Sequence, residues 1–109
     1  MNVDIELRGE GVTLFKPSGR LDAAAAPDLL ARLKGAIAEG QVRLAIDLAA
    51  VSFVDSSGLG ALVSGLKAAR RAEGDLRLIA PNQQVQRLLR LTTLDRVFVI
   101  AEAPEAAWA

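Results

Sequence analysis

The sequence lacks two residue types that carry much of protein chemistry: among its 109 residues there is no cysteine and no histidine. Without cysteine there is no disulfide framework and no thiolate chemistry. Without histidine as well, the usual zinc ligand sets are missing and a Ser-His-Asp triad cannot form. A phosphate-cradling glycine motif is also missing. We therefore expect no metal site, no bound cofactor and no catalytic residue.

Excess charge and long apolar runs are absent too. Thirteen basic residues balance thirteen acidic ones, which leaves no electrostatic basis for a nucleic-acid or membrane-surface protein. No apolar run approaches the length of a membrane span, and the first residues do not resemble a signal peptide with its basic and then apolar segments. The expectation is a cytoplasmic domain that contacts neither nucleic acid nor membrane.

What is present is an ordinary globular composition, with 51% apolar and 24% charged residues. A chain of this length suffices for one hydrophobic core but not for two. No linker, internal repeat or low-complexity segment divides it. We therefore expect one domain over residues 1–109, which ends in an alanine-rich tail from 101 to 109. Trp108 is interpreted as a tail residue that either docks on the body or hangs free.

The first forty residues predict a hairpin followed by a helix. Apolar and charged residues alternate over 3–8, which is the period of a half-buried strand. A turn at 9–11 precedes a second strand-like run at 12–15, and Pro17-Ser18-Gly19 is expected to end the hairpin. The helix that follows has an apolar face at amphipathic spacing, made of Ala26, Leu29, Leu30, Leu33, Ala36 and Ile37.

The remaining elements alternate between strands and helices. The run 42–48 is nearly continuous in apolar residues, so we expect a central strand covered on both faces. A helix at 57–72, a strand at 76–80, a helix capped by Asn82 and a strand at 97–100 follow. This order, β-β-α-β-α-β-α-β, predicts an α/β fold with a central mixed β-sheet. The hairpin joins parallel β-α-β units, and the helices pack against the sheet.

Residues 51–60 (VSFVDSSGLG) combine small hydroxyl side chains with two glycines between a strand and a helix. Ser56 and Ser57 therefore fall at or just before a helix N-terminus, where unpaired N–H groups and the positive end of the helix dipole gather. The simplest interpretation is a helix cap, because Asp and Ser are preferred capping residues. Gly58 and Gly60 favour a further role. Each costs about 1 kcal/mol in a helix, and glycine suits a place where something approaches the backbone closely.

This stretch resembles the signature of the anti-sigma factor antagonists, the bacterial members of the STAS domain family. The segment Gly19-x-Leu21-Asp22, followed by an amphipathic helix, resembles the second recurring stretch of that family. The order of elements and the length also match over essentially the whole chain. The resemblance therefore covers both the fold and two motifs.

The resemblance implies a binding module, not an enzyme, that is switched by phosphorylation. It places the phosphoacceptor at Ser56, the first serine after the aspartate, with Ser57 as the alternative. The implied partner is an anti-sigma factor that is also a serine/threonine kinase with a histidine-kinase-type ATP-binding fold. The unphosphorylated antagonist sequesters this kinase and so releases a sigma factor, and a phosphatase reverses the modification.

The implied partner-binding residues are those of the two motifs: Asp22, Asp55, Ser56, Ser57, Gly58 and Leu59. A weak homodimer is a further hypothesis.

Other interpretations stay open. Asp22 is equally well interpreted as a turn residue before the helix. Accessory or scaffold STAS domains of lipid-transport ATPase complexes and signalling assemblies share the fold and part of the motif, although the intact Asp-Ser-Ser-Gly favours the antagonist. An enzyme with Ser56 as its nucleophile is disfavoured. No histidine is available, and no lysine lies in the motif to activate the hydroxyl.

Overall fold

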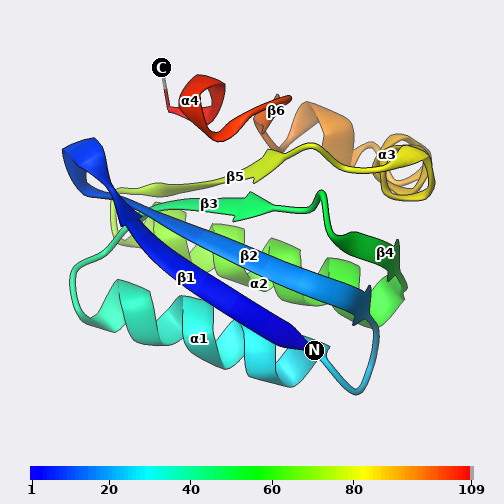
Figure 1. Ribbon diagram of the computed structural model, residues 1–109, viewed down its shortest axis with the longest axis horizontal. Helices are drawn as coiled ribbons and strands as arrows, with labels where there is room; N and C mark the ends of the chain where they lie inside the picture. The colour runs from blue at the N-terminus through cyan, green and yellow to red at the C-terminus, as the bar shows by residue number, and fades with distance from the viewer. Residues whose placement is uncertain (109) are drawn as a thin grey trace.

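The structure is a computed structural model that describes residues 1–108 of the chain (Figure 1). Its strands are β1 (Asn2–Arg8), β2 (Val12–Leu21), β3 (Arg43–Asp47), β4 (Val51–Val54), β5 (Asp75–Ile79) and β6 (Ile100–Ala101). Its α-helices are α1 (Ala26–Ala38), α2 (Ser56–Arg71), α3 (Gln83–Leu91) and α4 (Pro104–Ala107). Two short 3-10 helices lie at Gly9–Gly11 and Leu94–Arg96.

The strands form one mixed sheet in the order β1-β2-β3-β5-β6, and β4 pairs with β2. The β1–β2 pair is antiparallel, whereas β2–β3, β2–β4, β3–β5 and β5–β6 are parallel. The predicted α/β fold, in which a hairpin joins parallel β-α-β units, is confirmed.

β2 is longer than predicted and joins two parts of the sheet. Its residues 12–15 pair with β3, and its residues 19–21 pair with β4. The pairing of β1 with β2 ends at Asn2 opposite Ser18, as predicted for the hairpin, but strand β2 itself does not end there and continues to Leu21. Pro17 lies between the stretches that pair with β3 and β4, so its missing N–H breaks neither parallel ladder.

β4 has no counterpart in the predicted order of elements. It is only four residues long and follows β3 after a short break. Its two end residues, Val51 and Val54, are buried, whereas Ser52 between them is exposed. So short a run has too little alternation to be told from a turn by pattern alone.

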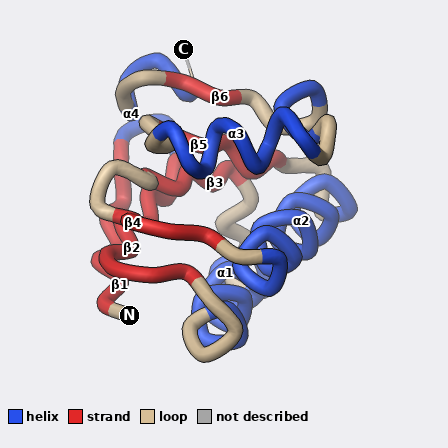
Figure 2. Tube along the Cα trace, turned by 90° about the vertical axis from the view of Figure 1, so that its right-hand side faces the viewer, coloured by secondary structure: helices blue, strands red, loops and turns tan. Residues whose placement is uncertain are grey.

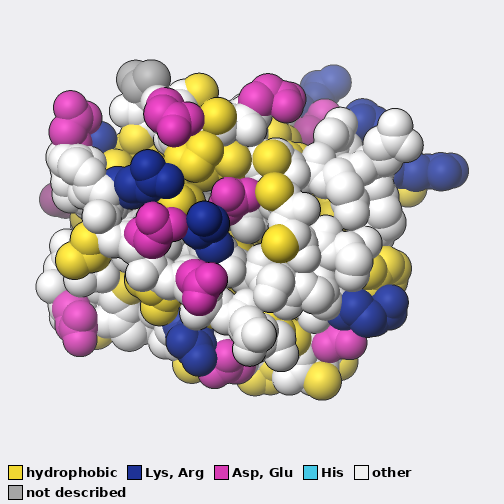
Figure 3. Space-filling view, in the orientation of Figure 1, with side chains coloured by type: hydrophobic (Ala, Val, Ile, Leu, Met, Phe, Trp, Pro, Cys, Tyr) yellow, Lys and Arg dark blue, Asp and Glu magenta, His cyan; other side chains and the backbone are white. Residues whose placement is uncertain are grey.

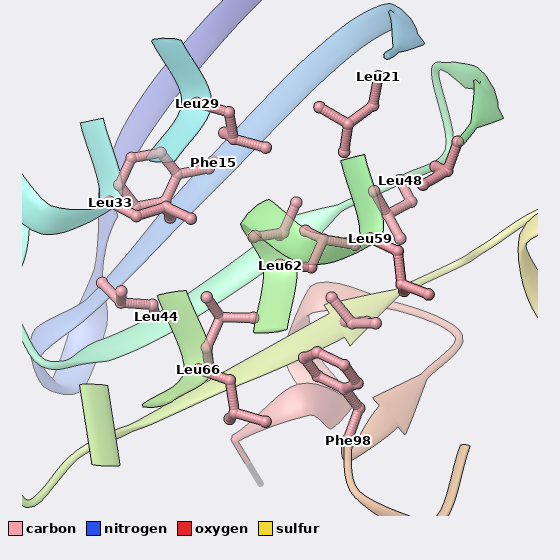
Figure 4. Close-up of a cluster of buried hydrophobic side chains, with 14 of the residues drawn as sticks. Phe15, Leu21, Leu29, Leu33, Leu44, Leu48, Leu59, Leu62, Leu66 and Phe98 are labelled. Atoms are coloured by element: carbon pink, nitrogen blue, oxygen red, sulfur yellow. The ribbon is translucent and has the colours of Figure 1, made fainter. Parts of the chain in front are cut away.

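The helices α1 and α2 cover one face of the sheet (Figures 1 and 2). Their apolar stripes pack against the inward side chains of the strands to form the main core, part of which is drawn in Figure 4. Near β3 the opposite face is covered by α4, whose Ala107 packs with Leu14, Ala45 and Ile79. β3 is thus buried on both faces, as predicted.

The two edges of the sheet depart from the prediction. β6 is a two-residue strand at Ile100–Ala101 in place of the expected 97–100. Only Phe98 of that run enters the core. At the other edge β1 forms as predicted. Val3 is partly buried against the main core, but Ile5 is 48% exposed and Leu7 is 74% exposed.

Trp108 docks on the body of the domain. Its indole Nε1 donates a hydrogen bond to the Leu44 carbonyl oxygen at 3.1 Å. The guanidinium carbons of Arg77 and Arg43 lie 3.8 and 4.8 Å from the ring centroid, within the range of cation–π attraction. Among residues 1–108, no helix has both the length and the apolar character needed to cross a membrane.

Candidate functional site

Ser56 and Ser57 are the first two residues of α2, as the sequence predicts. Both side chains are exposed. The helix starts at the end of β4, beside the C-terminal end of β2, at the right of Figure 1. Two hydroxyl groups are therefore presented to solvent at the positive end of a helix of 16 residues.

Asp55 caps this helix. Its backbone is extended, with φ −99° and ψ −174°, and its Oδ1 accepts a hydrogen bond from the Gly58 N–H at 2.8 Å. Its carbonyl oxygen accepts the N–H of Leu59 at 2.9 Å, which is the first intrahelical bond. The cap interpretation is confirmed for Asp55. Its carboxylate points at the backbone and fixes the first turn of α2.

The two glycines of the motif have different surroundings. A Cβ on Gly58 would lie 2.2 Å from the Leu21 carbonyl oxygen and 2.8 Å from Leu21 Cγ, whereas a Cβ on Gly60 would meet nothing within 4 Å. The chain that approaches Gly58 closely is therefore the protein's own β2, and this glycine is buried. Gly60 is exposed and leaves the helix surface open beside the serines.

Three segments converge on Leu21. Leu21 pairs in parallel with Val54. Its carbonyl oxygen accepts the N–H of Asp55 at 3.2 Å, and the same oxygen lies against Gly58. Asp22 and Asp55 each follow one member of this strand pair, so they lie at the same edge of the sheet. The topology thus brings the two sequence motifs together.

Asp22 organises the turn between β2 and α1. Its Oδ1 accepts the N–H groups of Ala24 and Ala25 at 3.1 and 3.2 Å. Its other oxygen lies 3.8 Å from Nε of Arg20, whose side chain is largely exposed. The interpretation of Asp22 as a turn residue is therefore right. Its half-buried carboxylate also places negative charge at this edge.

Arg20 and Phe53 belong to the same edge but are not predicted from the sequence. They are paired in the β2–β4 register, and the Arg20 guanidinium carbon lies 4.4 Å from the Phe53 ring centroid. Their proximity depends on β4, a strand that the sequence pattern does not indicate. A cation thus stands beside Asp22 at the end of the sheet.

α3 supports β4 from the other side through side-chain amides. Gln84 makes two hydrogen bonds to the backbone of Val54, accepting its N–H at 3.0 Å and donating to its carbonyl oxygen at 2.9 Å. Asn82 donates to the carbonyl oxygens of Val51 and Ser52, both at 3.2 Å, and caps α3 as predicted. These amides take the place of a neighbouring strand. No sequence signal marks Gln84, because its partner strand is not predicted.

The arrangement suits a group that is modified by another protein. Ser56 and Ser57 are accessible, and the sequence has no histidine that could serve as a base beside them. The capping carboxylate of Asp55 is engaged with the Gly58 N–H. The hydroxyl groups can accept a phosphoryl group, and the N-terminus of α2 favours negative charge there.

Comparisons with known proteins agree with this picture. The model of the STAS domain family matches residues 5–107. The anti-sigma-B factor antagonist of Listeria monocytogenes is 31% identical over 103 residues, which cover 92% of this chain and 90% of the relative. The crystal structure of an anti-sigma factor antagonist from Mycobacterium paratuberculosis has a TM-score of 0.86 at 28% identity and covers 98% of this chain and 90% of its own.

A more distant similarity concerns the fold alone. The phosphorylated form of the Bacillus cell fate determinant SpoIIAA has a TM-score of 0.79 at 20% identity, with 98% of this chain and 96% of that one covered.

The contact between Gly58 and Leu21 predicts opposite effects for two matched substitutions. Gly58→Ala should lower the free energy of unfolding by about 2 kcal/mol, because the new methyl group overpacks against β2 backbone. Gly60→Ala should raise it by up to about 1 kcal/mol, because alanine is the better helix former and the space there is open. Urea unfolding with an unchanged m-value measures both. Equal stabilities would mean that Leu21 does not constrain the start of α2.

Proposed function

Because the chain belongs to the STAS domain family, we propose that it is an anti-sigma factor antagonist controlled by phosphorylation of Ser56. In the unphosphorylated state it binds an anti-sigma factor that is also a serine kinase, and so frees a sigma factor. A relative of nearly the same length bears the name anti-sigma-B factor antagonist. The observation that carries the proposal is the exposed Ser56 hydroxyl at the first position of α2.

The acceptor position is well suited to a phosphoryl group. Phosphorylation adds about −1.5 to −2 charge and three acceptor oxygens, and a helix N-terminus stabilises such a group. Asp55 and Asp22 repel it from the same edge, while Arg20 offers a cation beside Asp22. The turn is fixed by the Asp55 side-chain cap and by the hydrogen bond from the Asp55 N–H to the Leu21 carbonyl oxygen. The added charge therefore acts on whatever contacts this surface more than on the fold.

The proposed partner surface divides into contacting and supporting residues. Ser56 and Ser57 are exposed, and Asp22 and Asp55 are half-buried, so the side chains of these four are available to a partner. Gly58 and Leu59, the remaining members, are buried. Their part in binding is therefore to fix the turn, and the open helix surface at Gly60 gives a partner close access to the backbone.

In this proposal the chemistry comes from the partners. The kinase transfers phosphate from ATP to Ser56, and a phosphatase removes it. The chain itself supplies the acceptor and the binding surface and has no catalytic role. The function would be carried out in the cytoplasm, where sigma factors act on transcription.

The proposal predicts where phosphate is found and what it does. Incubated with its anti-sigma kinase and ATP, the protein should be phosphorylated at Ser56, and Ser56→Ala should abolish this while Ser57→Ala, the matched neighbour, should not. Phosphorylation should weaken the complex at least tenfold, equivalent to about 1.4 kcal/mol, because the partner must desolvate or repel a dianion. Ser56→Asp should weaken it less, since a carboxylate has less charge and fewer acceptor oxygens.

Mass-spectrometric site mapping and calorimetric titration of the kinase measure these effects. Phosphate at Ser57 would refute the assignment of the acceptor. Equal affinities of the unmodified, phosphorylated and Ser56→Asp forms would refute the switch and favour a scaffold role in a larger assembly.

Asp22 provides a second test, because its structural and electrostatic roles can be separated. Asp22→Ala removes the acceptor of two N–H groups and should cost about 1 kcal/mol of stability. Asp22→Asn keeps an acceptor oxygen and should stay close to wild-type stability. For both variants, the loss of kinase-binding free energy, or the equivalent loss calculated from the phosphorylation rate, should exceed the loss in the free energy of unfolding.

The matched control is Asp28→Ala, on the exposed first turn of α1, which should leave binding and phosphorylation unchanged. If Asp22→Asn has wild-type affinity and rate, Asp22 is a turn residue only.

A further inference from the structure

β1 is the free edge strand of the sheet and carries exposed apolar side chains. It ends the strand order, and among residues 1–108 no strand pairs with its outer side. Ile5 is 48% exposed and Leu7 is 74% exposed. Edge strands with exposed apolar residues are the part of a sheet that most readily pairs with another strand.

These apolar residues form one wall of a groove. Ile5 and Leu7 face α1 across it, Gly35 and Ala36 line the helix side, and buried Phe15 lies at the base. Gly35 has no atom within 4 Å of where its Cβ would be, so this side of α1 is open. Asp4, Glu6 and Arg8 alternate with the apolar residues and therefore project from the other face of β1.

A second copy of β1 fits this edge by charge as well as by shape. We consider two copies of β1 that pair antiparallel about a twofold axis perpendicular to the sheet. This axis keeps the apolar faces of the two strands on the same side of the joined sheet. Odd-numbered residues therefore lie opposite odd-numbered ones, and even-numbered residues opposite even-numbered ones. In the register centred on Glu6, Asp4 faces Arg8 of the second copy and Ile5 faces Leu7 of the second copy. Both contacts occur twice by symmetry.

Neighbouring registers fit less well. Centred on Ile5, the pairing places Asp4 opposite Glu6 of the second copy, which is a repulsive pair. Centred on Leu7, it pairs only residues 6–8, because β1 ends at Arg8. In the register centred on Glu6 the two glutamates meet at the axis, but each already has Lys16 Nζ of its own chain at 3.4 Å.

We propose that the chain forms a weak homodimer in which β1 pairs antiparallel with β1 of a second copy, in the register centred on Glu6. The sheet then continues across the dimer, and the two Ile5–Leu7 contacts cover the exposed apolar edge. Figure 3 shows basic and acidic side chains interspersed with apolar ones on the face of the molecule that β1 crosses. Only five residues of each strand take part in the pairing, so the association is weak and depends on concentration.

The dimer leaves the Ser56 turn free. Residues 4–8 of β1 lie opposite residues 12–16 of β2, whereas Asp22 and Asp55 follow the far end of β2 at Leu21. Dimer formation and binding of a partner at α2 are therefore compatible, and one dimer presents two such sites.

A charge swap tests both the dimer and its register. Sedimentation velocity over a range of concentrations should give a reversible monomer–dimer equilibrium for the wild-type chain. Asp4→Arg and Arg8→Asp should each weaken the dimer about tenfold or more, because each turns two attractive pairs into repulsive ones. The double variant D4R/R8D should restore wild-type association. Arg87→Asp, a charge change at an exposed position of α3, should have no effect.

The outcomes separate the alternatives. A monomer at every concentration would overturn the proposal. Stronger association of Asp4→Arg would also overturn it, because that result is expected in the register centred on Ile5, where residue 4 faces Glu6 of the second copy. Failure of the double variant to restore the dimer would refute the register. Leu7→Lys, at a position that is 74% exposed, should dissociate the dimer while circular dichroism stays unchanged, and its continued dimerisation would contradict the proposal.

Discussion

The contact between the Leu21 carbonyl group and the start of α2 determines the geometry of this protein's site. The carbonyl oxygen accepts the Asp55 N–H at 3.2 Å and lies where a Cβ on Gly58 would have to be. Only glycine lets the helix begin so close to β2. The Asp55 cap then sets the first turn, and Ser56, at the first position of that turn, has an exposed side chain. The position of the proposed phosphoacceptor thus follows from the close approach of the Leu21 carbonyl group to the backbone of Asp55 and Gly58.

The same turn is held on its other side by α3. Gln84 pairs with both backbone groups of Val54, and Asn82 binds the carbonyl oxygens of Val51 and Ser52. β4 is therefore fixed between β2 and α3, although it is only four residues long. In the proposed switch, a phosphoryl group at Ser56 would therefore change the charge of the surface more than the fold beneath it, which is what a reversible binding switch requires.

The sequence predicted the elements whose pattern is local and missed those that depend on tertiary pairing. The apolar stripe of α1, the continuous apolar run of β3 and the Asn82 cap of α3 are readable because each is encoded within a few residues. Residues 17 and 18 belong to a strand because they pair with β1, and β4 forms because it pairs with residues 19–21 of β2. Arg20, Phe53 and Gln84 were missed for the same reason, since their positions depend on β4. At the site, the motif located Ser56 and Asp22, but only the structure assigns Gly58 to the fold and leaves Gly60 open.

Amide hydrogen exchange of the unmodified and Ser56-phosphorylated chains is the most direct test of the claim that phosphorylation alters a surface on an unchanged fold. The account predicts differences confined to the turn at residues 55–59 and its neighbours 21–22. The slow amides of β2, β4 and α3 should keep their protection to within about twofold, because their hydrogen bonds do not involve the hydroxyl group. Loss of protection at Val54 or along α3 would contradict the account, because it would mean that the modification acts by unfolding the turn and not by its charge.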